Sequence, residues 1–575
     1  MDSDYAASPL TEGTPAIGSR VHLIGHVLFE FSTIQYNTSQ PSHLVRPPFK
    51  PFNPHPDHLP AMLLRNITNT QRRGPAPTML KRRFTKTKTS RARKPRTTIH
   101  SLPNEVLTEI FVAATFVSEE SRLDVPDILS HVSSRWRAIV VNTSLFWTFI
   151  VVTFPFAAEQ IARAKVALAR SKNRPIDVHV DVRDPEWTWE FDEDQHPVIS
   201  FDMVEIMEWL GPSHPRWRSL SVFTDNWEPM HTFLAYSTMF SSLPVLETLS
   251  LNRCNAYAGL PGTAPESVTP IELFGGNACL PKLRHVVLSG VHIDYSRSGF
   301  KDLISLDLRH QSHSVSPSLQ ELRQILAASP ELNSLSLVAL SPPCPRGFEE
   351  LDGAPTTMSH LKKLTLGWWN VEDAAELLEV FRVPTAEELS LEDIGSSLLG
   401  TLEHAMFDDF HAHDSTLILG VLTGMSGAHR NSTSLSPPLI APGPSSLRRP
   451  DKQTCGFPSC LRTLAINGVH LDPAAFSEFL PRLISLEELE LKSVDHKLIS
   501  ALSIVMLEPP SVDQHPTTSD SVSGPPLRTL KLWLSSGGFR ESARALYGIK
   551  SRRPDLRIVN MVKLVLPGTT SNRTA

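Results

Sequence analysis

The side chains best suited to catalysis or metal binding gather in residues 404–414. Imidazole and carboxylate groups are common ligands for zinc and other divalent metals. The candidates in this stretch are His404, Asp408, Asp409, His411, His413 and Asp414. A metal site also needs several of these groups to converge, with hydrogen bonds that orient them. Because the stretch adjoins a Ser- and Pro-rich segment, we expect a solvated polar stretch and no metal site.

Other signs of catalysis are weak. The acidic run at residues 190–194 offers paired carboxylates, but no base or pocket can be placed beside it, so we expect a solvated loop. The sequence has no Gly-rich phosphate loop, no Gly-x-Ser-x-Gly motif and no Cys-His context typical of a nucleophile. We therefore predict that the protein is not an enzyme and uses no cofactor.

Residues 72–96 form a strongly basic run that contains no Asp or Glu. Such a run is typical of a nuclear localisation signal, a weak nucleic-acid contact or a solvated tail. The run includes only one aromatic residue, Phe84, so stacking on nucleic-acid bases is not supported. We expect no nucleic-acid partner and leave the import signal and the plain tail as alternatives.

Composition places further limits on the class of protein. The 575 residues carry a net charge of −5, and 48 prolines against 27 glycines favour loops and linkers over a compact enzyme. The five cysteines form no zinc-binding pattern, and their odd number without a secretory signal indicates a reducing compartment. No apolar run reaches the roughly 18 residues that a membrane span needs. We expect a cytoplasmic or nuclear protein with no membrane contact.

Two apolar stripes at helical spacing lie between Ile99 and Trp147. Pro103 and Glu105 suit the first turn of a helix that carries Val106, Leu107, Ile110 and Phe111. Residues 118–127 are polar and contain Pro126, so we predict a loop there. A second helical stripe follows at Ile128, Val132, Trp136 and Ile139, and Arg135 and Arg137 should leave that face. Leu145, Phe146 and Trp147 open a third apolar segment.

This stretch resembles the F-box, and especially the F-box-like domains of large families in mushroom-type fungi. The motif is Leu102-Pro103-x-Glu105-x-Leu107-x-x-Ile110-Phe111, followed by Val132, Arg135-Trp136 and Leu145 to Trp147. The segment from Thr115 to Asp127 departs from the compact linker of the shortest F-boxes. The less specific alternative is that these residues form a generic three-helix element of a larger protein.

The resemblance implies docking to a Skp-type adaptor and, through it, to a cullin-based ubiquitin ligase. The residues expected to contact the adaptor are Leu102, Pro103, Glu105, Leu107, Ile110, Phe111, Val132 and Trp136.

The remainder of the chain repeats a Leu-x-x-Leu-x-Leu pattern, which resembles the strand of a leucine-rich repeat. Its second leucine-type position, called the marker position below, falls at residues 249, 286, 306, 335, 364, 389, 464, 489 and 530. The steps are 37, 20, 29, 29, 25, 75, 25 and 41 residues, several of them in or close to the ~20–29 residues of such repeats. Leu220 indicates an earlier copy and Ile558 a last one. The step of 75 leaves room for one irregular repeat near residues 417–419.

The leucines should point into a continuous core, since one strand and one helix cannot bury their shared apolar face alone. Intervening residues would line an open concave face, with Glu247, Thr248, Ser250, Lys363 and Thr365 as candidates. A less specific alternative is an α/β domain with unrelated buried strands.

We therefore predict an α/β protein in which a short three-helix F-box-like module precedes an irregular leucine-rich-repeat solenoid. Its expected parts are a disordered basic tail (1–98), the module (99–149), the repeat array (150–567) and a disordered tail (568–575). The array should carry disordered insertions near 425–458 and 508–526, which are rich in Ser and Pro.

Two functions fit this organisation. The first is a substrate-receptor subunit that docks an adaptor through the module and a target protein, not identifiable from sequence, through the repeats. The second is an interaction scaffold in which the module only caps the solenoid and has no ligase role. Solvent exposure of the stripe from Leu102 to Phe111 would favour the first, and its burial the second.

Overall fold

The computed structural model describes residues 99–187, 196–253, 270–276, 278–311, 315–340, 355–394, 418–419, 460–507, 526–534 and 539–562. The described residues fall into two compact units, 99–146 (the helical unit) and 147–562 (the sheet unit). Several predictions lie outside the described residues: both disordered tails with the basic run, the acidic run at 190–194, the His- and Asp-rich stretch at 404–414, the insertion near 425–458 and residues 508–525 of the other insertion.

The helical unit contains three α-helices, whose boundaries differ from those that its sequence pattern predicts. Its elements are η1 (Ile99–Ser101), α3 (Asn104–Thr115), α4 (Glu119–Val132), α5 (Ser134–Asn142) and the start of η2 (Ser144–Trp147). The loop predicted for residues 118–127 is wrong, because Ser118 caps α4 by accepting a hydrogen bond from the amide of Ser121. Pro126 suggested a break, yet it lies inside α4, where it is buried.

The stripe predicted from Ile128 to Ile139 belongs to two helices and not to one. Ser133 is extended and separates α4 from α5, and its hydroxyl accepts a hydrogen bond from the amide of Trp136. Serine is a favoured cap because its oxygen satisfies an amide that the first turn leaves unpaired. Val132 and Trp136 therefore belong to different helices, although their spacing is helical.

The sheet unit is built on one parallel sheet of 13 strands in its described part. The strands follow one another in chain order, except that β8 (Thr356–Thr357) and β10 (Phe381–Arg382) pair separately. The strands of the large sheet are β1 (Phe149–Thr153), β2 (Ile176–Asp181), β3 (Trp217–Thr224), β4 (Thr248–Arg253), β5 (His285–Ser289), β6 (Ser305–Gln311), β7 (Ser334–Leu340), β9 (Lys363–Trp368), β11 (Glu388–Asp393), β12 (Thr463–Asn467), β13 (Glu488–Lys492), β14 (Thr529–Leu534) and β15 (Arg557–Val562).

The marker positions form one continuous ladder across this sheet. Leu249 pairs with Val286, and in the same way Leu306, Leu335, Leu364, Leu389, Leu464, Leu489 and Leu530 follow strand by strand. Leu220 precedes this series and Ile558 ends it, as the pattern predicts. The leucine-type residues two positions later form a parallel ladder, and both ladders are buried from β4 to β14. Burial of branched aliphatic side chains between layers is what holds such strands together.

A shared backbone contact begins most of the strands. The carbonyl two residues before a marker accepts the amides of two consecutive residues at the start of the next strand. Thus the Arg284 carbonyl accepts from Ile304 and Ser305, and the Lys362 carbonyl accepts from Glu387 and Glu388. This contact recurs from Glu247 to Glu487 and fixes the register where each strand begins.

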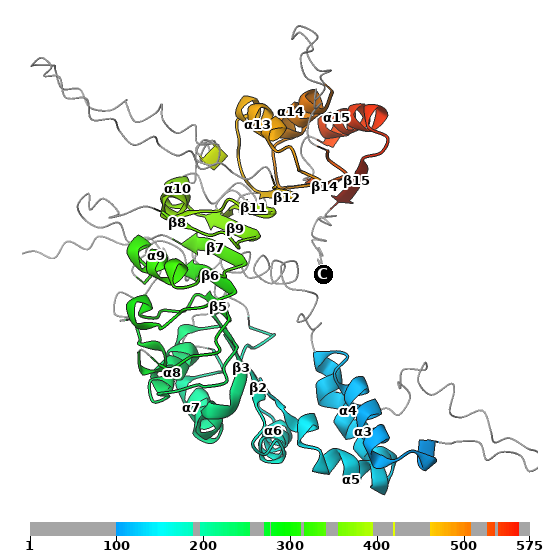
Figure 1. The fold of residues 1–575 in the computed structure, drawn as a ribbon, viewed down its shortest axis with the longest axis vertical. Coiled ribbons are helices and arrows are strands. Elements are labelled where there is room, and N and C mark those ends of the chain that lie inside the picture. The colour runs from blue at the N-terminus through cyan, green and yellow to red at the C-terminus, as the bar shows by residue number, and fades with distance from the viewer. Residues whose placement is uncertain are drawn as a thin grey trace, which may run out of the picture. The chain divides into compact units, whose positions relative to one another are not determined.

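Helices connect many of the strands and lie on one side of them, as Figure 1 shows for α8, α9 and α10. The described helices of this unit are α6 (Ala158–Arg170), α7 (Ser200–Leu210), η4 (Gly211–Arg216), α8 (Trp227–Ser237), η6 (Leu273–Gly275), η7 (Tyr295–Arg297), α9 (Leu319–Ala327), α10 (Val371–Val380), α13 (Pro473–Phe479), η8 (Leu480–Arg482), α14 (His496–Leu507) and α15 (Phe539–Arg552). Only η7 lies in the shortest step, between β5 and β6. None of the helices in the described ranges combines the length and the apolar character that a membrane span requires.

The long step between Leu389 and Leu464 adds no strand to the sheet. Strands β11 and β12 pair directly from Glu388↔Thr463 to Glu392↔Asn467. The irregular repeat considered for this step is therefore not inserted into the ladder. Ile418 and Leu419 are helical and buried.

The outward positions of the strands are half-buried, in contrast to the fully buried ladders. Thr248, Ser250, Lys363 and Thr365 lie at such positions, and Glu247, just before β4, is exposed. The mixed α/β class is confirmed, and the sheet is one large parallel sheet. That this sheet is a leucine-rich-repeat solenoid stays a prediction.

Two histidines of the sheet unit are buried, His292 just after β5 and His310 within β6. Burial and the charge of Arg253 lower the pKa of His292 to about 4. Its ring lies 4.4 Å from that of Trp227, and neither ring nitrogen has a hydrogen-bond partner in the described part of the chain. Burial and Arg309, opposed by Asp307, lower the pKa of His310 to about 4 as well. Both imidazoles are therefore neutral in the folded protein at neutral pH.

We predict that the sheet unit loses stability as the pH falls from about 6.5 to about 4. In this window the histidines of the unfolded chain take up protons, whereas the buried imidazoles of the folded protein stay neutral. This difference lowers the free energy of unfolding by up to about 3 kcal/mol for each histidine. The measurement is the urea midpoint of unfolding at several pH values for the parent and for His292→Phe, which should flatten the pH dependence.

Burial raises the pKa of Asp225, which contributes in the opposite direction in both proteins and cancels in the comparison. An equal slope for the parent and His292→Phe would contradict this account.

Candidate functional site

Helix α3 carries two apolar stripes with different surroundings. Leu107 and Phe111 are buried, at 0% and 2% exposure, and Thr115 continues this stripe. Val106 and Ile110 lie on another side of the same helix and are 43% and 44% exposed. One stripe thus forms the core of the helical unit, and the other is open to solvent.

Helix α4 adds two more exposed aliphatic residues, Ile128 and Val132, which are 51% and 54% exposed and one turn apart. Val132 ends α4 just before α5, and Arg135 at the start of α5 binds the beginning of α3. The end of α4 therefore lies near the start of α3. We call Val106, Ile110, Ile128 and Val132 the exposed apolar set.

Arg135 joins the third helix to the start of the first. Its guanidinium donates hydrogen bonds to the carbonyl oxygens of His100 (2.8 Å) and Leu102 (2.6 Å) and to Oδ1 of Asn104 (2.9 Å). A planar guanidinium can make several such bonds at once. The Leu102-Pro103 segment is thus fixed by a residue more than thirty positions away.

The aromatic residue next to Arg135 closes the core. The ring centroids of Phe111 and Trp136 lie 4.7 Å apart with an interplanar angle of 56°, a favourable tilted arrangement. Trp136 is half-buried. The two predicted contact residues Phe111 and Trp136 therefore hold α3 and α5 together.

The eight predicted adaptor contacts divide into three groups. Leu107 and Phe111 are buried in the described structure, and Leu102 and Trp136 are half-buried. The remaining four are exposed: Pro103, Glu105, Ile110 and Val132. Whether any of the eight contacts an adaptor stays a prediction.

Sequence reasoning missed three features of this unit. Arg135 was expected only to leave the apolar face, and no local pattern indicates that it binds α3. Val106 was placed on the same stripe as Leu107, but a step of one residue turns about 100° around a helix and separates the two. Ile128, another member of the exposed apolar set, was also not among the predicted contacts.

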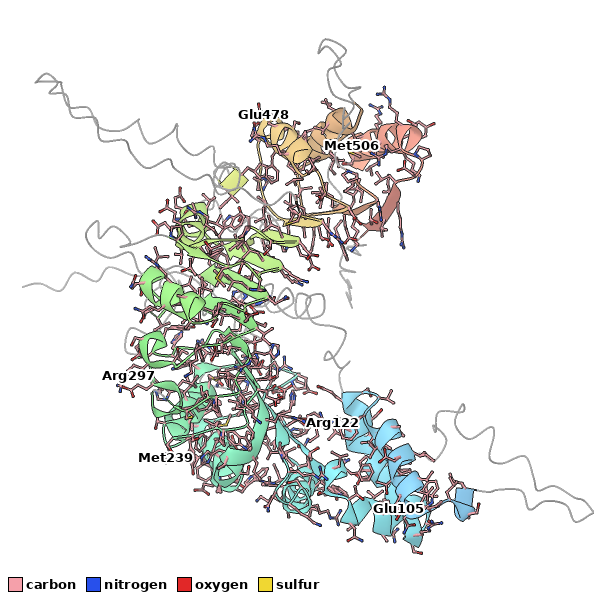
Figure 2. The ribbon with its side chains drawn as sticks, in the orientation of Figure 1. Glu105, Arg122, Met239, Arg297, Glu478 and Met506 are labelled. Carbon is pink, nitrogen blue, oxygen red and sulfur yellow. The ribbon has the colours of Figure 1, made fainter. Side chains whose placement is uncertain are left out.

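Polar groups stabilise the ends of the helical pair. Figure 2 marks Glu105 near the start of α3 and Arg122 near the start of α4, at opposite ends of the pair. The carboxylate of Glu105 lies in the first turn, where it suits the positive end of the helix dipole. The Arg122 guanidinium lies 5.4 Å from the centre of the Phe116 ring in the turn between the helices.

In the described ranges, no three His, Cys, Asp or Glu side chains are placed to hold a metal ion.

Comparison with known proteins identifies one region. Residues 99–153 match a protein-family model described as F-box-like. The match covers the helical unit and extends into strand β1. A search of curated proteins gives no match. F-box-like domains generally bind Skp-type adaptors, whereas the likeness to fungal families stays a prediction.

We predict that Arg135→Lys loosens the start of α3 by roughly 1–3 kcal/mol, since a lysine cannot make the three hydrogen bonds together. Hydrogen–deuterium exchange should speed up in residues 100–108. The matched control is Arg137→Lys, which removes one bond to the Ser130 carbonyl at the other side of the break. Unchanged exchange at residues 100–108 in Arg135→Lys would refute the role of this residue.

Proposed function

We propose that this protein is a substrate-receptor subunit of a Skp–cullin–F-box type ubiquitin ligase. The single observation that carries the proposal is the exposed apolar set on an F-box-like unit. Val106, Ile110, Ile128 and Val132 are each more than two-fifths exposed and lie on the first two turns of α3 and the second half of α4. Grouped exposed aliphatic residues of this kind mark an interaction surface.

The energetics favour a partner at this surface. Fully burying a Val or Ile side chain contributes about 1.5–3 kcal/mol, so covering the remaining exposed half of each contributes roughly 1 kcal/mol. Four such residues supply a substantial hydrophobic centre for an interface, with Pro103 and Glu105 beside it. A helical unit of this size also has a marginal core and gains stability from a bound partner.

We propose further that the sheet unit is an irregular leucine-rich-repeat solenoid that holds the target protein. The support is the register of its marker positions over successive strands and the recurring backbone contact at the strand starts. The outward positions around Ser250 and Thr365 would then face the target. Catalysis is left to other subunits, and the receptor contributes by raising the local concentration of its target.

The second candidate is a scaffold in which the helices only cap the repeats. Exposure of the stripe from Leu102 to Phe111 distinguishes the two functions, and this stripe is only partly exposed. Leu107 and Phe111 are buried, whereas Val106 and Ile110 are exposed. The buried half has a sufficient role in the core beside Trp136, and the exposed half favours docking. We therefore keep the receptor as the leading proposal.

We predict that Ile110→Asp abolishes capture of this protein by a purified Skp-type adaptor without changing its unfolding temperature. The aspartate would place a charge in the apolar interface, whereas in the free protein it would face water. The matched control is Ile504→Asp on α14, which makes the same change on a helix at 56% exposure. Full adaptor binding by Ile110→Asp would contradict the proposed docking surface.

Phe111→Ala tests a different property of the helical unit. Removing this buried ring should destabilise the unit by about 3–5 kcal/mol, so a loss of adaptor binding would follow from unfolding. A lower unfolding temperature for the helical unit, measured by calorimetry, is the expected result. An unchanged unfolding temperature would contradict the placement of Phe111 in the core.

A further inference from the structure

The four aliphatic side chains of the exposed apolar set are open to solvent in the described structure. Val106 and Ile110 lie one turn apart on α3, and Ile128 and Val132 lie one turn apart on α4. Each pair spans about 6 Å along its helix. Contact with an apolar segment would remove these side chains from water and is therefore favourable. A segment of the same chain that is held nearby can compete with a partner protein for this contact.

The N-terminal part of the chain joins the helical unit beside the exposed apolar set. Residues 1–98 end where η1 begins, and η1 is followed at once by α3, which carries Val106 in its first turn. Arg135 fixes this entrance by donating hydrogen bonds to the carbonyl oxygens of His100 and Leu102. The preceding chain is thus tethered within a few residues of the exposed apolar set.

One stretch of this N-terminal part, residues 21–31, has the pattern of an amphipathic helix. Four of its apolar residues recur at steps of 3, 4 and 3 and fall on one face of a helix: Val21, Ile24, Leu28 and Phe31. Its polar residues recur at steps of four and fall on the opposite face: His22, His26 and Glu30. An isolated helix of this length, with Gly25 inside it, is not stable in water. The stretch therefore needs an apolar surface in order to fold.

We propose that residues 21–31 fold back as a helix onto the exposed apolar set and compete there with the adaptor. The apolar face of this segment covers the aliphatic pairs of α3 and α4, and its polar face stays in water, as in other complexes of an amphipathic helix with an apolar surface. The contact is autoinhibitory, because the adaptor has to displace the segment before it docks. The inference rests on the docking surface proposed above and adds the regulation of that surface.

The length of the tether allows this competition. Residues 32–98 connect the segment to the helical unit, and a flexible chain of this length has an r.m.s. end-to-end distance of roughly 45 Å. The segment then has an effective concentration on the order of 1 mM at the surface. A weak contact with a dissociation constant of about 0.25 mM is enough to dock the segment in about four molecules of five. The adaptor then binds about fivefold more weakly than it would to a chain whose segment cannot dock.

The first test is the dissociation constant of the full chain for a purified Skp-type adaptor, measured by calorimetry. Leu28→Asp places a charge on the apolar face of the segment, so this variant should bind the adaptor about fivefold more tightly than the parent. The matched control is His26→Asp, which introduces the same residue on the polar face and should keep the parent value. Equal affinities for the parent and Leu28→Asp would overturn the proposal.

The second test needs no adaptor. A photoreactive benzoylphenylalanine replaces Glu109, an exposed residue of α3 next to Ile110, and the full chain is irradiated. The expected product is a cross-link within one chain to residues 21–31, which Leu28→Asp should remove and His26→Asp should keep. Cross-links only to other residues of the chain, cross-links to a second copy, or none at all would overturn the proposal.

The two tests separate this contact from the docking surface itself. A cross-link to residues 21–31 in a chain that binds no adaptor would keep the contact and refute the receptor role. Adaptor binding with equal affinities and without the cross-link would refute only the contact.

Discussion

The in-register stacking of buried aliphatic residues is the constraint on which the sheet unit depends. Each marker residue from Leu249 to Leu530 lies beside its counterpart in the next strand, and the leucine-type residue two positions on does the same. A shift of one residue in any strand would turn its buried residues to the outward face. The paired amides that bond one carbonyl at the start of each strand oppose such a shift. Core and backbone thus specify the same register.

This constraint acts on only a few positions of each strand. Strands β11 and β12 pair directly although a long insertion separates them in the chain. Residues at the outward positions and at the strand ends are less restricted, because they do not have to fit into the buried ladders. The residues two positions before the markers are an example, since most of them are charged but Ile304 and Asn333 are not. A stable repeated core with variable edges is well suited to recognising a partner.

Much of the fold could be predicted from the sequence, because period and spacing report burial directly. The leucine pattern located the strands of the large sheet from β3 to β15, including the weaker ones at Leu220 and Ile558, but not β1 and β2. The helical stripe located α3. The failures have local causes. Pro126 indicated a loop but lies within α4, and the helical spacing from Val132 to Trp136 hid the cap at Ser133. Which side of α3 is buried depends on contacts with α4 and α5, which no local pattern encodes.

The account assigns adaptor binding to the helical unit and target binding to the sheet unit. The most direct measurement is hydrogen–deuterium exchange of the full chain with and without a purified Skp-type adaptor. The account predicts slower exchange in α3 and in the second half of α4, around Ile110 and Val132, with no change in the strands. Adaptor binding that leaves these helices unprotected, or that protects the strands instead, would contradict it.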